Sequence, residues 1–160
     1  NSNFDPWPLG MALWPHRQLR FMAKSELFNP AFKKLLLAGG AFPVRRGEGD
    51  LEAMKLAMRL AHDGEIVAMF PEGTRPSKGL RKKHEARPRT GAARIAIGAH
   101  VPLVPAAVKG TAGLARLQRL EVSYGKPIDL SDLQGMPPRD AAQIATDRLM
   151  AAIAALHAAL

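Results

Sequence analysis

The sequence predicts an α/β sandwich, in which helices flank a largely parallel central sheet, and a single domain that spans residues 1–160. Short apolar runs alternate with longer amphipathic segments along the chain, and this order of elements is typical of a parallel sheet. A chain of 160 residues has the usual length of one domain and is long enough to bury a core. Its apolar share of 47% is also typical of a globular protein.

Turn and cap residues divide the first half of the chain into its expected elements. Pro30 near the start and Gly39-Gly40 at the end bracket a short helix. Asp50 is the expected N-cap of a second helix, which ends at Asp63-Gly64. Four apolar residues recur at helical spacing within it: Leu51, Met54, Met58 and Ala61. The expected strands are the start of 20–28, then 41–44 and then 65–70, the last being a continuous apolar run that suits burial on both faces.

A loop and four further elements are expected in the second half. The stretch PEGTRPSKG holds two Pro and two Gly in nine residues, which excludes regular structure there. Thr90 is a possible cap for the helix that follows, and two prolines, Pro102 and Pro105, favour an edge or irregular strand. The four elements are a helix over 90–99, strands over 101–108 and 120–125, and a helix from about 139 to 160.

The charge balance restricts the class of partner. The formal net charge is +9, so the chain should favour anionic partners: phosphate-bearing ligands, a phospholipid surface or nucleic acid. The alternative is a basic protein whose charge serves only solubility. The sequence has no cysteine, which excludes disulfides, thiolate metal sites and a cysteine nucleophile. The histidines lack metal-ligand spacing, so no metal site is expected, and no apolar run is long enough to span a bilayer.

The most informative stretch is FPEGTR, Phe70 to Arg75. Gly73 allows the backbone to approach a ligand closely, and Thr74 can donate a hydrogen bond. Arg75 offers a planar fork that matches phosphate oxygens, while Glu72 either holds Arg75 or accepts a bond from a substrate hydroxyl. Taken alone, the same six residues suit a strand-to-helix turn with a surface ion pair, so the motif needs support from elsewhere in the chain.

That support comes from three further short blocks of sequence. Asn-Ser-Asn-Phe-Asp-Pro opens the chain, GAFPVRR precedes FPEGTR with Arg46 as its key residue, and VPLVPAAVKG follows it. Together they resemble the glycerolipid acyltransferase family, best known for 1-acylglycerol-3-phosphate acyltransferases, and the order and spacing agree over about the first 110 residues. The segment AKSELF is also typical of that family. The resemblance implies a glycerol-3-phosphate acyltransferase-like α/β sandwich.

The family's first block is HxxxxD, and this chain supplies only its later part. Asp5 takes the place of the acid, and the family's histidine would fall directly before Asn1. None of the chain's five histidines has an Asp five positions later. We therefore expect the chain to be N-terminally truncated just inside this motif, and to be inactive as it stands. Apart from the resemblance, Asp5 would be read as a turn or cap residue.

The resemblance also implies a mechanism. The histidine would take a proton from the acceptor's hydroxyl, which attacks the thioester of acyl-CoA or acyl-carrier protein, and Asp5 would orient the imidazole. Arg46 and Arg75 would anchor the acceptor's phosphate, with Glu72, Gly73 and Thr74 shaping the pocket. Lysophosphatidate suits two arginines best as acceptor. No cofactor is expected beyond the acyl thioester, which is a co-substrate.

Three assignments have alternatives that the sequence leaves open. Lys24 is either a further phosphate ligand or a solvated lysine at a strand end. The basic stretch RPSKGLRKKHEARPR, 75–89, either meets anionic lipid headgroups and coenzyme A phosphates or is a solvated loop. Three aromatic residues near the start suit either the bilayer interface or the core: Trp7, Trp14 and Phe21.

The expected location is the cytoplasmic face of a membrane, with attachment either peripheral or through a segment absent from the sequence. The competing functions are an acyltransferase for another lysolipid, or a non-catalytic basic domain that binds phosphate or nucleic acid. Nucleic acid is disfavoured as a partner because only one Tyr and six Phe are present and basic and aromatic residues do not interleave.

Overall fold

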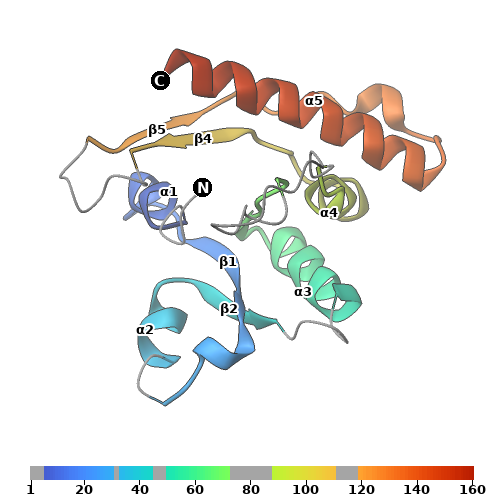
Figure 1. The fold of residues 1–160 in the computed structure, drawn as a ribbon. Helices are drawn as coiled ribbons and strands as arrows, with labels where there is room; N and C mark the ends of the chain where they lie inside the picture. The colour runs from blue at the N-terminus through green and yellow to red at the C-terminus, as the bar shows by residue number, and fades with distance from the viewer. Residues whose placement is uncertain (1–5, 31–32, 45–49, 73–87, 111–118) are drawn as a thin grey trace, which may run out of the picture.

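The computed structural model describes residues 6–30, 33–44, 50–72, 88–110 and 119–160. In this part of the chain, helices surround a 3-stranded parallel sheet, ordered β2-β1-β3, and a 2-stranded antiparallel sheet, β4-β5 (Figure 1). The strands are β1 (Leu19–Lys24), β2 (Ala41–Val44), β3 (Ile66–Ala68), β4 (Ala106–Lys109) and β5 (Glu121–Tyr124). The α-helices are α1 (Pro6–Leu13), α2 (Lys33–Ala38), α3 (Asp50–His62), α4 (Gly91–Ala99) and α5 (Pro138–Ala159), with 3-10 turns at Ser25–Leu27 and Ser131–Leu133.

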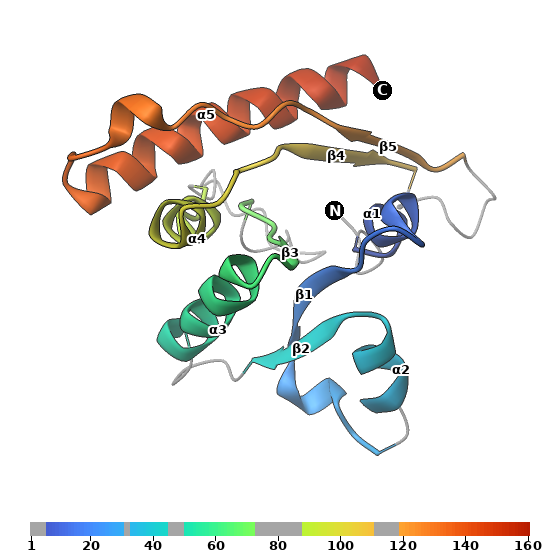
Figure 2. The same ribbon diagram turned by 180° about the vertical axis from the view of Figure 1, so that it is seen from behind.

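The parallel sheet confirms the predicted α/β fold class. β1 lies in the middle, and it pairs in parallel with β2 from Phe21 to Lys24 and with β3 from Leu19 to Phe21. Helices α2 and α3 make the two crossover connections, and they lie on opposite sides of this sheet (Figures 1 and 2). The prediction for β3 was wrong in two respects: the strand covers only Ile66–Ala68, and all three residues are half-buried instead of fully buried. β3 is an edge of the described sheet, so its pairing is one-sided.

The turn from α2 into β2 depends on glycine, as the sequence predicts. Gly40 has a φ of 87°, in the left-handed region that favours glycine. A Cβ atom at this position would lie 2.1 Å from the backbone carbonyl oxygen of Leu19. The Gly40 carbonyl also accepts a hydrogen bond of 3.2 Å from the Phe21 amide. This close approach brings the start of β2 against β1.

The face of the parallel sheet that carries Phe42 packs against α3 and α4. Phe42 on β2 meets Ala57 and Ala61 of α3, and small side chains allow the helix to approach the sheet closely. The predicted stripe on α3 is correct from Met54 onward, but Leu51 is 62% exposed because the first turn lies beyond the sheet. The side chain of Asp50 lies outside the described residues, so its capping role stays a prediction.

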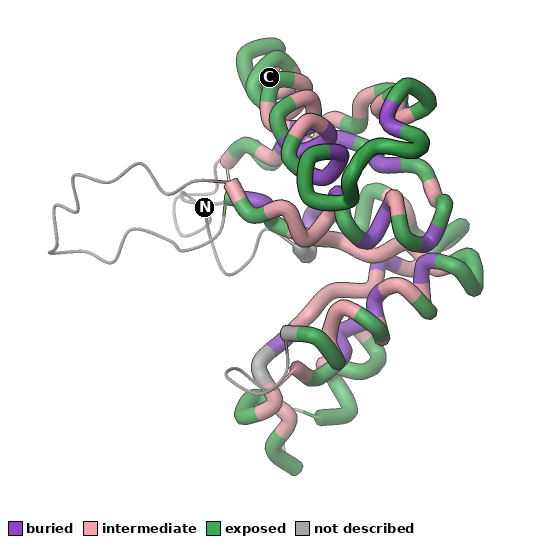
Figure 3. Tube along the Cα trace, turned by 90° about the vertical axis from the view of Figure 1, so that its right-hand side faces the viewer, coloured by how far each residue is buried: buried purple, intermediate pink, exposed green. Residues whose placement is uncertain are grey.

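Helix α5 covers the antiparallel sheet and packs on α4. Its innermost residues are small, with Ala141, Ala145 and Thr146 almost fully buried, and the Thr146 hydroxyl donates to the Ala142 carbonyl at 2.7 Å. Burial concentrates on this inner side, while the outer turns of the helix are exposed (Figure 3). The predicted larger stripe of this helix is only half-buried except at Leu149: Ile144, Ile153, Leu156 and Leu160.

The segment before β4 lies outside the strand, although two of its carbonyls accept backbone hydrogen bonds: Leu103 from the Ile128 amide at 2.8 Å and Pro105 from the Gly125 amide at 2.9 Å. The predicted strand over 101–108 begins only at Ala106, because Pro102 and Pro105 have no N–H to donate to a neighbouring strand. This bears out the expectation of an irregular strand. Thr90 is the N-cap residue of α4, as the sequence predicts, although its side chain makes no capping hydrogen bond.

Helix α1 is an element that the sequence analysis missed. Pro6, Pro8 and Gly10 all argue against a helix, yet a proline in the first turn breaks no hydrogen bond, since its N–H would have no partner there. The first turn therefore tolerates both prolines. No helix of the described residues is both long and apolar enough to cross a bilayer.

Candidate functional site

In the sequence, the candidate residues follow the carboxyl ends of the parallel strands. Because β1, β2 and β3 run in parallel, their last residues Lys24, Val44 and Ala68 lie toward the same edge. Ligands of open α/β sheets bind outside this edge. Two of the sequence blocks leave the sheet there: the arginine block directly after Val44, and FPEGTR after Ala68.

The FPEGTR block is described only in its first half. Phe70 is 43% exposed, Pro71 is buried, and Glu72 is exposed beyond it. The buried proline fixes the direction in which the chain leaves β3. Glu72 is thus placed at the carboxyl edge with its carboxylate in solvent, as a substrate contact requires. Gly73, Thr74 and Arg75 lie outside the described residues.

A backbone hydrogen bond holds the base of the segment that follows. The Arg89 amide donates to the Pro71 carbonyl at 2.7 Å. Residues on both sides of the stretch 73–87 are therefore fixed to each other, one next to β3 and the other next to α4. Met69 strengthens this junction, because its terminal methyl lies 3.3 Å from where a Cβ of Gly91 would be. The exit from β3 is thus tied to the helix behind it.

The remaining candidates are placed only through their neighbours in the chain. Lys24 is the last residue of β1, at the carboxyl edge, but its side chain lies outside the described residues. Arg46 lies outside them as well, two positions after the end of β2. Asp5 is also outside them, directly before the first residue of α1. The roles predicted for these three side chains stay predictions.

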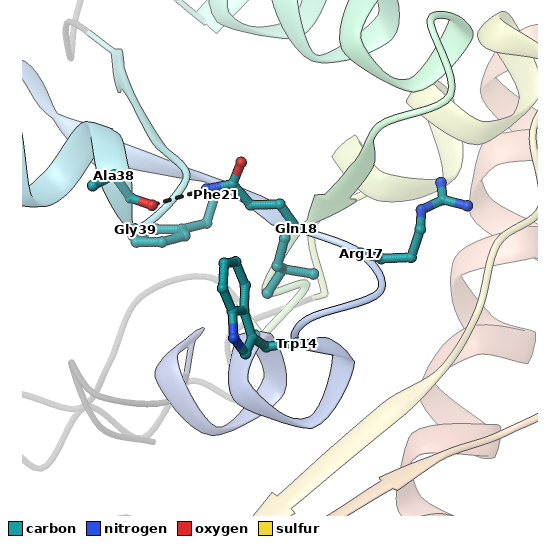
Figure 4. A pocket seen from close by; sticks show the side chains of 8 residues that line it. Trp14, Arg17, Gln18, Phe21, Ala38 and Gly39 are labelled. Atoms are coloured by element: carbon teal, nitrogen blue, oxygen red, sulfur yellow. Dashed lines mark hydrogen bonds between the residues drawn. The ribbon is translucent and has the colours of Figure 1, made fainter.

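Helix α1 packs against the amino end of β1. The Arg17 amide donates to the Leu13 carbonyl at 3.0 Å, which reverses the chain between α1 and β1. Gly10 packs on Leu19, the first residue of β1, and a Cβ on Gly10 would lie 3.7 Å from the Leu19 Cβ. Figure 4 shows the end of α1, with Trp14, next to the start of β1.

The amino edge of the sheet holds ion pairs instead of a ligand site. Arg20 donates to Glu65 at 3.0 Å, and this hydrogen bond lowers the pKa of the Glu65 carboxyl from its ordinary value. Arg17 donates to the Gly64 carbonyl at 2.5 Å. His62 and Asp63 also lie here, 3.7 Å apart and well exposed. These contacts tie β1 to the α3–β3 turn, so this His–Asp pair is on the wrong edge to serve FPEGTR.

A shallow pocket of about 90 Å³ lies between α1, the start of β1 and the end of α2. Trp14 and Phe21 face each other across it, and Gln18 closes one side by donating to the Ala38 carbonyl at 2.9 Å (Figure 4). Trp14 is 68% exposed, which excludes the core as its location, while Phe21 is half-buried. The Trp7 side chain lies outside the described residues.

Histidine and carboxylate side chains do not cluster in the described part of the chain. No group of three His, Asp or Glu there is placed to hold a metal ion. Four histidines are described, and all are exposed: His16, His62, His100 and His157.

One residue near α1 was missed by the sequence analysis. The Tyr124 hydroxyl donates to the Leu9 carbonyl at 2.7 Å, which joins β5 to α1. The two residues are 115 positions apart, so no local pattern reports their contact. The only signal is compositional, because Tyr124 is the chain's one tyrosine.

Comparison with known proteins adds an independent finding. The acyltransferase family model matches residues 1–109, the part of the chain that holds the first three sequence blocks and all but the last residue of the fourth. The chain is 33% identical over 149 residues to 1-acyl-sn-glycerol-3-phosphate acyltransferase of Bacillus subtilis, covering 91% of this chain and 71% of that protein. It is 34% identical over 138 residues to the Streptococcus pneumoniae protein of the same name, covering 83% of this chain and 49% of that protein.

A third relative is the probable 1-acyl-sn-glycerol-3-phosphate acyltransferase of Mycoplasma pneumoniae, 30% identical over 130 residues, or 76% of this chain and 47% of that protein. The match to the family model, the parallel sheet and the position of FPEGTR at its carboxyl edge agree with one another. The chain belongs to the acyltransferase family.

Proposed function

We propose that this acyltransferase moves a fatty acyl group from acyl-CoA or acyl-carrier protein to the free hydroxyl of lysophosphatidate. The observation that carries the proposal is the exit of two arginine-bearing blocks from β2 and β3 at one edge of the sheet. β2 and β3 flank β1, so the two exits are separated by two strand spacings, about 10 Å, across the sheet and by a stagger of three residues, again about 10 Å, along it, since Val44 pairs with Lys24 and Ala68 with Phe21. Arg46 and Arg75, reaching inward from the two sides, would hold one phosphate between them.

The names of the relatives support this acceptor. The Bacillus and Streptococcus proteins are both named as enzymes that acylate 1-acyl-sn-glycerol-3-phosphate. Its phosphomonoester is the dianion that two guanidinium groups suit, and its free hydroxyl is the nucleophile that the reaction needs. The net charge of +9 agrees with anionic substrates of this kind.

The chemistry rests on proton removal and positioning. A histidine directly before Asn1 would complete HxxxxD, and its imidazole would take the proton of the acceptor hydroxyl as the oxygen attacks the thioester carbonyl. The C–S bond then breaks, and the thiol leaves with a proton. Asp5 would hold the imidazole in the productive tautomer. Because the substrate hydroxyl is itself the nucleophile, no covalent acyl-enzyme is required.

We also propose an anionic membrane as a partner, at its cytoplasmic face. Helix α2 exposes two lysines, Lys33 and Lys34, together with Leu35 (58% exposed) and Leu37 (44% exposed). Exposed Trp14 lies across the pocket from the end of this helix. A basic and apolar surface of this kind suits lipid headgroups. It would keep the protein close to its lipid acceptor.

The decisive experiment compares two chains. One begins at Asn1 and the other carries a histidine directly before Asn1, and each receives acyl-CoA and lysophosphatidate. We expect the extended chain to release free thiol at a rate at least about 100-fold above that of the chain without the histidine, on the order of a general base's contribution. An alanine added at the same position is the matched control. Equal rates from all three chains would refute the role of the histidine.

The choice of acceptor is tested in the same assay. Replacing lysophosphatidate with a lysolipid that lacks a phosphomonoester should lower kcat/KM, because one dianionic group is lost from between the arginines. Higher activity with another lysolipid would select the alternative acceptor. Nucleic-acid binding should be weak and vanish at moderate salt. A tight, sequence-selective complex would instead support the non-catalytic basic domain.

A further inference from the structure

Tyr124 joins two parts of the molecule that are distant in sequence. Its hydroxyl, on the last residue of β5, donates to the backbone carbonyl of Leu9 at 2.7 Å. Leu9 belongs to α1 and follows Asp5 by four positions. Helix α1 packs through Gly10 on the start of β1, so it lies between the parallel and the antiparallel sheets (Figures 1 and 2). The hydrogen bond fixes the helix to the second of them.

The backbone at Tyr124 is held in the sheet, while the residue itself is 39% exposed. Its backbone pairs with Ala106 of β4, and the next amide, that of Gly125, donates to the Pro105 carbonyl at 2.9 Å. Helix α5 lies behind this point, because Leu156 and Pro105 both approach Gly125 closely. A tyrosine side chain has few rotatable bonds, so little freedom remains between this backbone and the hydroxyl. The backbone that carries Tyr124 is therefore fixed by both β4 and α5.

Helix α1, at the acceptor end of this hydrogen bond, needs tertiary contacts to be stable. Helix α1 has 8 residues, a length at which a helix is marginal in water without tertiary contacts. Leu9 is buried at 7% exposure, but Met11 on the same helix is 73% exposed, so only part of α1 is covered by the described residues. A directional hydrogen bond restrains sliding and rotation of the helix, which apolar contacts alone allow.

The donor is available throughout the range of an assay. Burial raises the pKa of the Tyr124 hydroxyl above its ordinary value of 10.0. The proton therefore stays on the oxygen at neutral and mildly alkaline pH, and the oxygen remains a donor.

We infer that Tyr124 is a positioning residue: by donating to the Leu9 carbonyl, it fixes α1, whose first residue directly follows Asp5 in the chain, to β5. This inference rests on the proposed function, in which Asp5 orients the catalytic imidazole. A displacement of about 1 Å at such a pair is enough to lower the rate strongly. Tyr124 touches no reacting atom, so its effect should fall on kcat and spare substrate binding.

The test uses the histidine-extended chain and the variant Tyr124→Phe, which removes one hydroxyl and keeps the ring. We expect kcat to fall about tenfold, the upper range for a neutral hydrogen bond, with both KM values unchanged. The matched control is Ser123→Ala, which removes the neighbouring hydroxyl of β5; that hydroxyl has no hydrogen-bond partner among the described residues. We expect the control to leave kcat unchanged.

A second readout does not depend on catalysis. Hydrogen exchange of the α1 amides after Leu9 should accelerate in Tyr124→Phe and not in Ser123→Ala, because the helix loses its anchor. Unchanged exchange would show that the hydrogen bond from Tyr124 does not stabilise α1. Faster exchange with unchanged kcat would show that the position of α1 does not affect the reaction. A raised KM with normal kcat would assign Tyr124 to binding and overturn positioning. If the parent chain releases no thiol, the proposed function fails, while the exchange result still decides whether Tyr124 holds α1.

Discussion

The role proposed for Arg75 depends on the geometry of its side chain. A guanidinium presents two parallel N–H donors to a phosphate, whereas a lysine in the same place would supply charge without that fork. Glu72, three positions earlier, is exposed beyond the end of β3.

Arg75→Gln should raise the KM for the phosphate-bearing acceptor about tenfold or more, because a charge-assisted hydrogen bond to the phosphate is lost. The KM for the acyl thioester should change much less. Initial rates of the histidine-extended chain with each substrate varied in turn measure both constants. The matched control is Arg94→Gln, which removes the same charge from an exposed position on α4. A larger effect on the thioester's KM would place Arg75 beside coenzyme A instead.

The sequence alone identifies residues whose role depends on their neighbours in the chain. FPEGTR is readable because a proline, a glycine and an arginine at fixed spacing have few other uses together. The contact of Tyr124 cannot be predicted from the sequence, because its hydrogen-bond partner is 115 positions away. His62 and Asp63 show the reverse case: an adjacent pair that looks catalytic lies at the amino edge, where only the fold reveals that it is remote from the motif.

At the scale of elements, the α2–β2 turn fits against β1 with no room for a side chain. Gly40→Ala must place a methyl 2.1 Å from the Leu19 carbonyl oxygen, so backbone has to move in addition to the strain at positive φ. We expect a loss of about 3 kcal/mol or more in the free energy of unfolding, from the left-handed penalty and the overpacking together. Urea denaturation monitored by circular dichroism measures it.

Gly135→Ala separates the two causes. Gly135 has a φ of 81°, close to that of Gly40, but nothing lies within 4 Å of where its Cβ would be. This control should cost about 1 kcal/mol, the strain alone. If both variants lose the same free energy, the contact with β1 contributes nothing.

The elements themselves were predictable where capping and spacing agree. The helices ended by Gly39-Gly40 and by Asp63-Gly64, the strand over 41–44 and the C-terminal helix all follow from turn residues and periodicity. Helix α1 was missed because its prolines carry a local penalty that its position in the first turn removes. The length of β3 was overestimated, since an apolar run does not report how many residues find a pairing strand.

At the scale of the whole molecule, exposed lysines and exposed apolar side chains lie on the same surface near α2. We expect the protein to bind vesicles with anionic lipid and to leave purely zwitterionic ones in solution, with binding that weakens as salt rises. The double variant Lys33→Gln, Lys34→Gln should lower the partition coefficient at least about tenfold, from about 1 kcal/mol per basic group. Co-sedimentation with vesicles measures it.

The charge-matched control for that experiment is Lys126→Gln with Arg139→Gln. Both residues are exposed, and they lie beyond β5 and at the start of α5 instead of on α2. Equal losses from the two double variants would show that net charge, and no particular surface, drives association. Binding to zwitterionic vesicles at high salt would show that apolar contacts dominate.

The hydrogen bond between the Arg89 amide and the Pro71 carbonyl has a consequence for how this protein can change over evolution or by engineering. It closes the intervening stretch at its root, so insertions and deletions there need not strain β3 or α4. A change in the length of that stretch beyond Arg75 should therefore leave the positions of β3 and α4 unaltered.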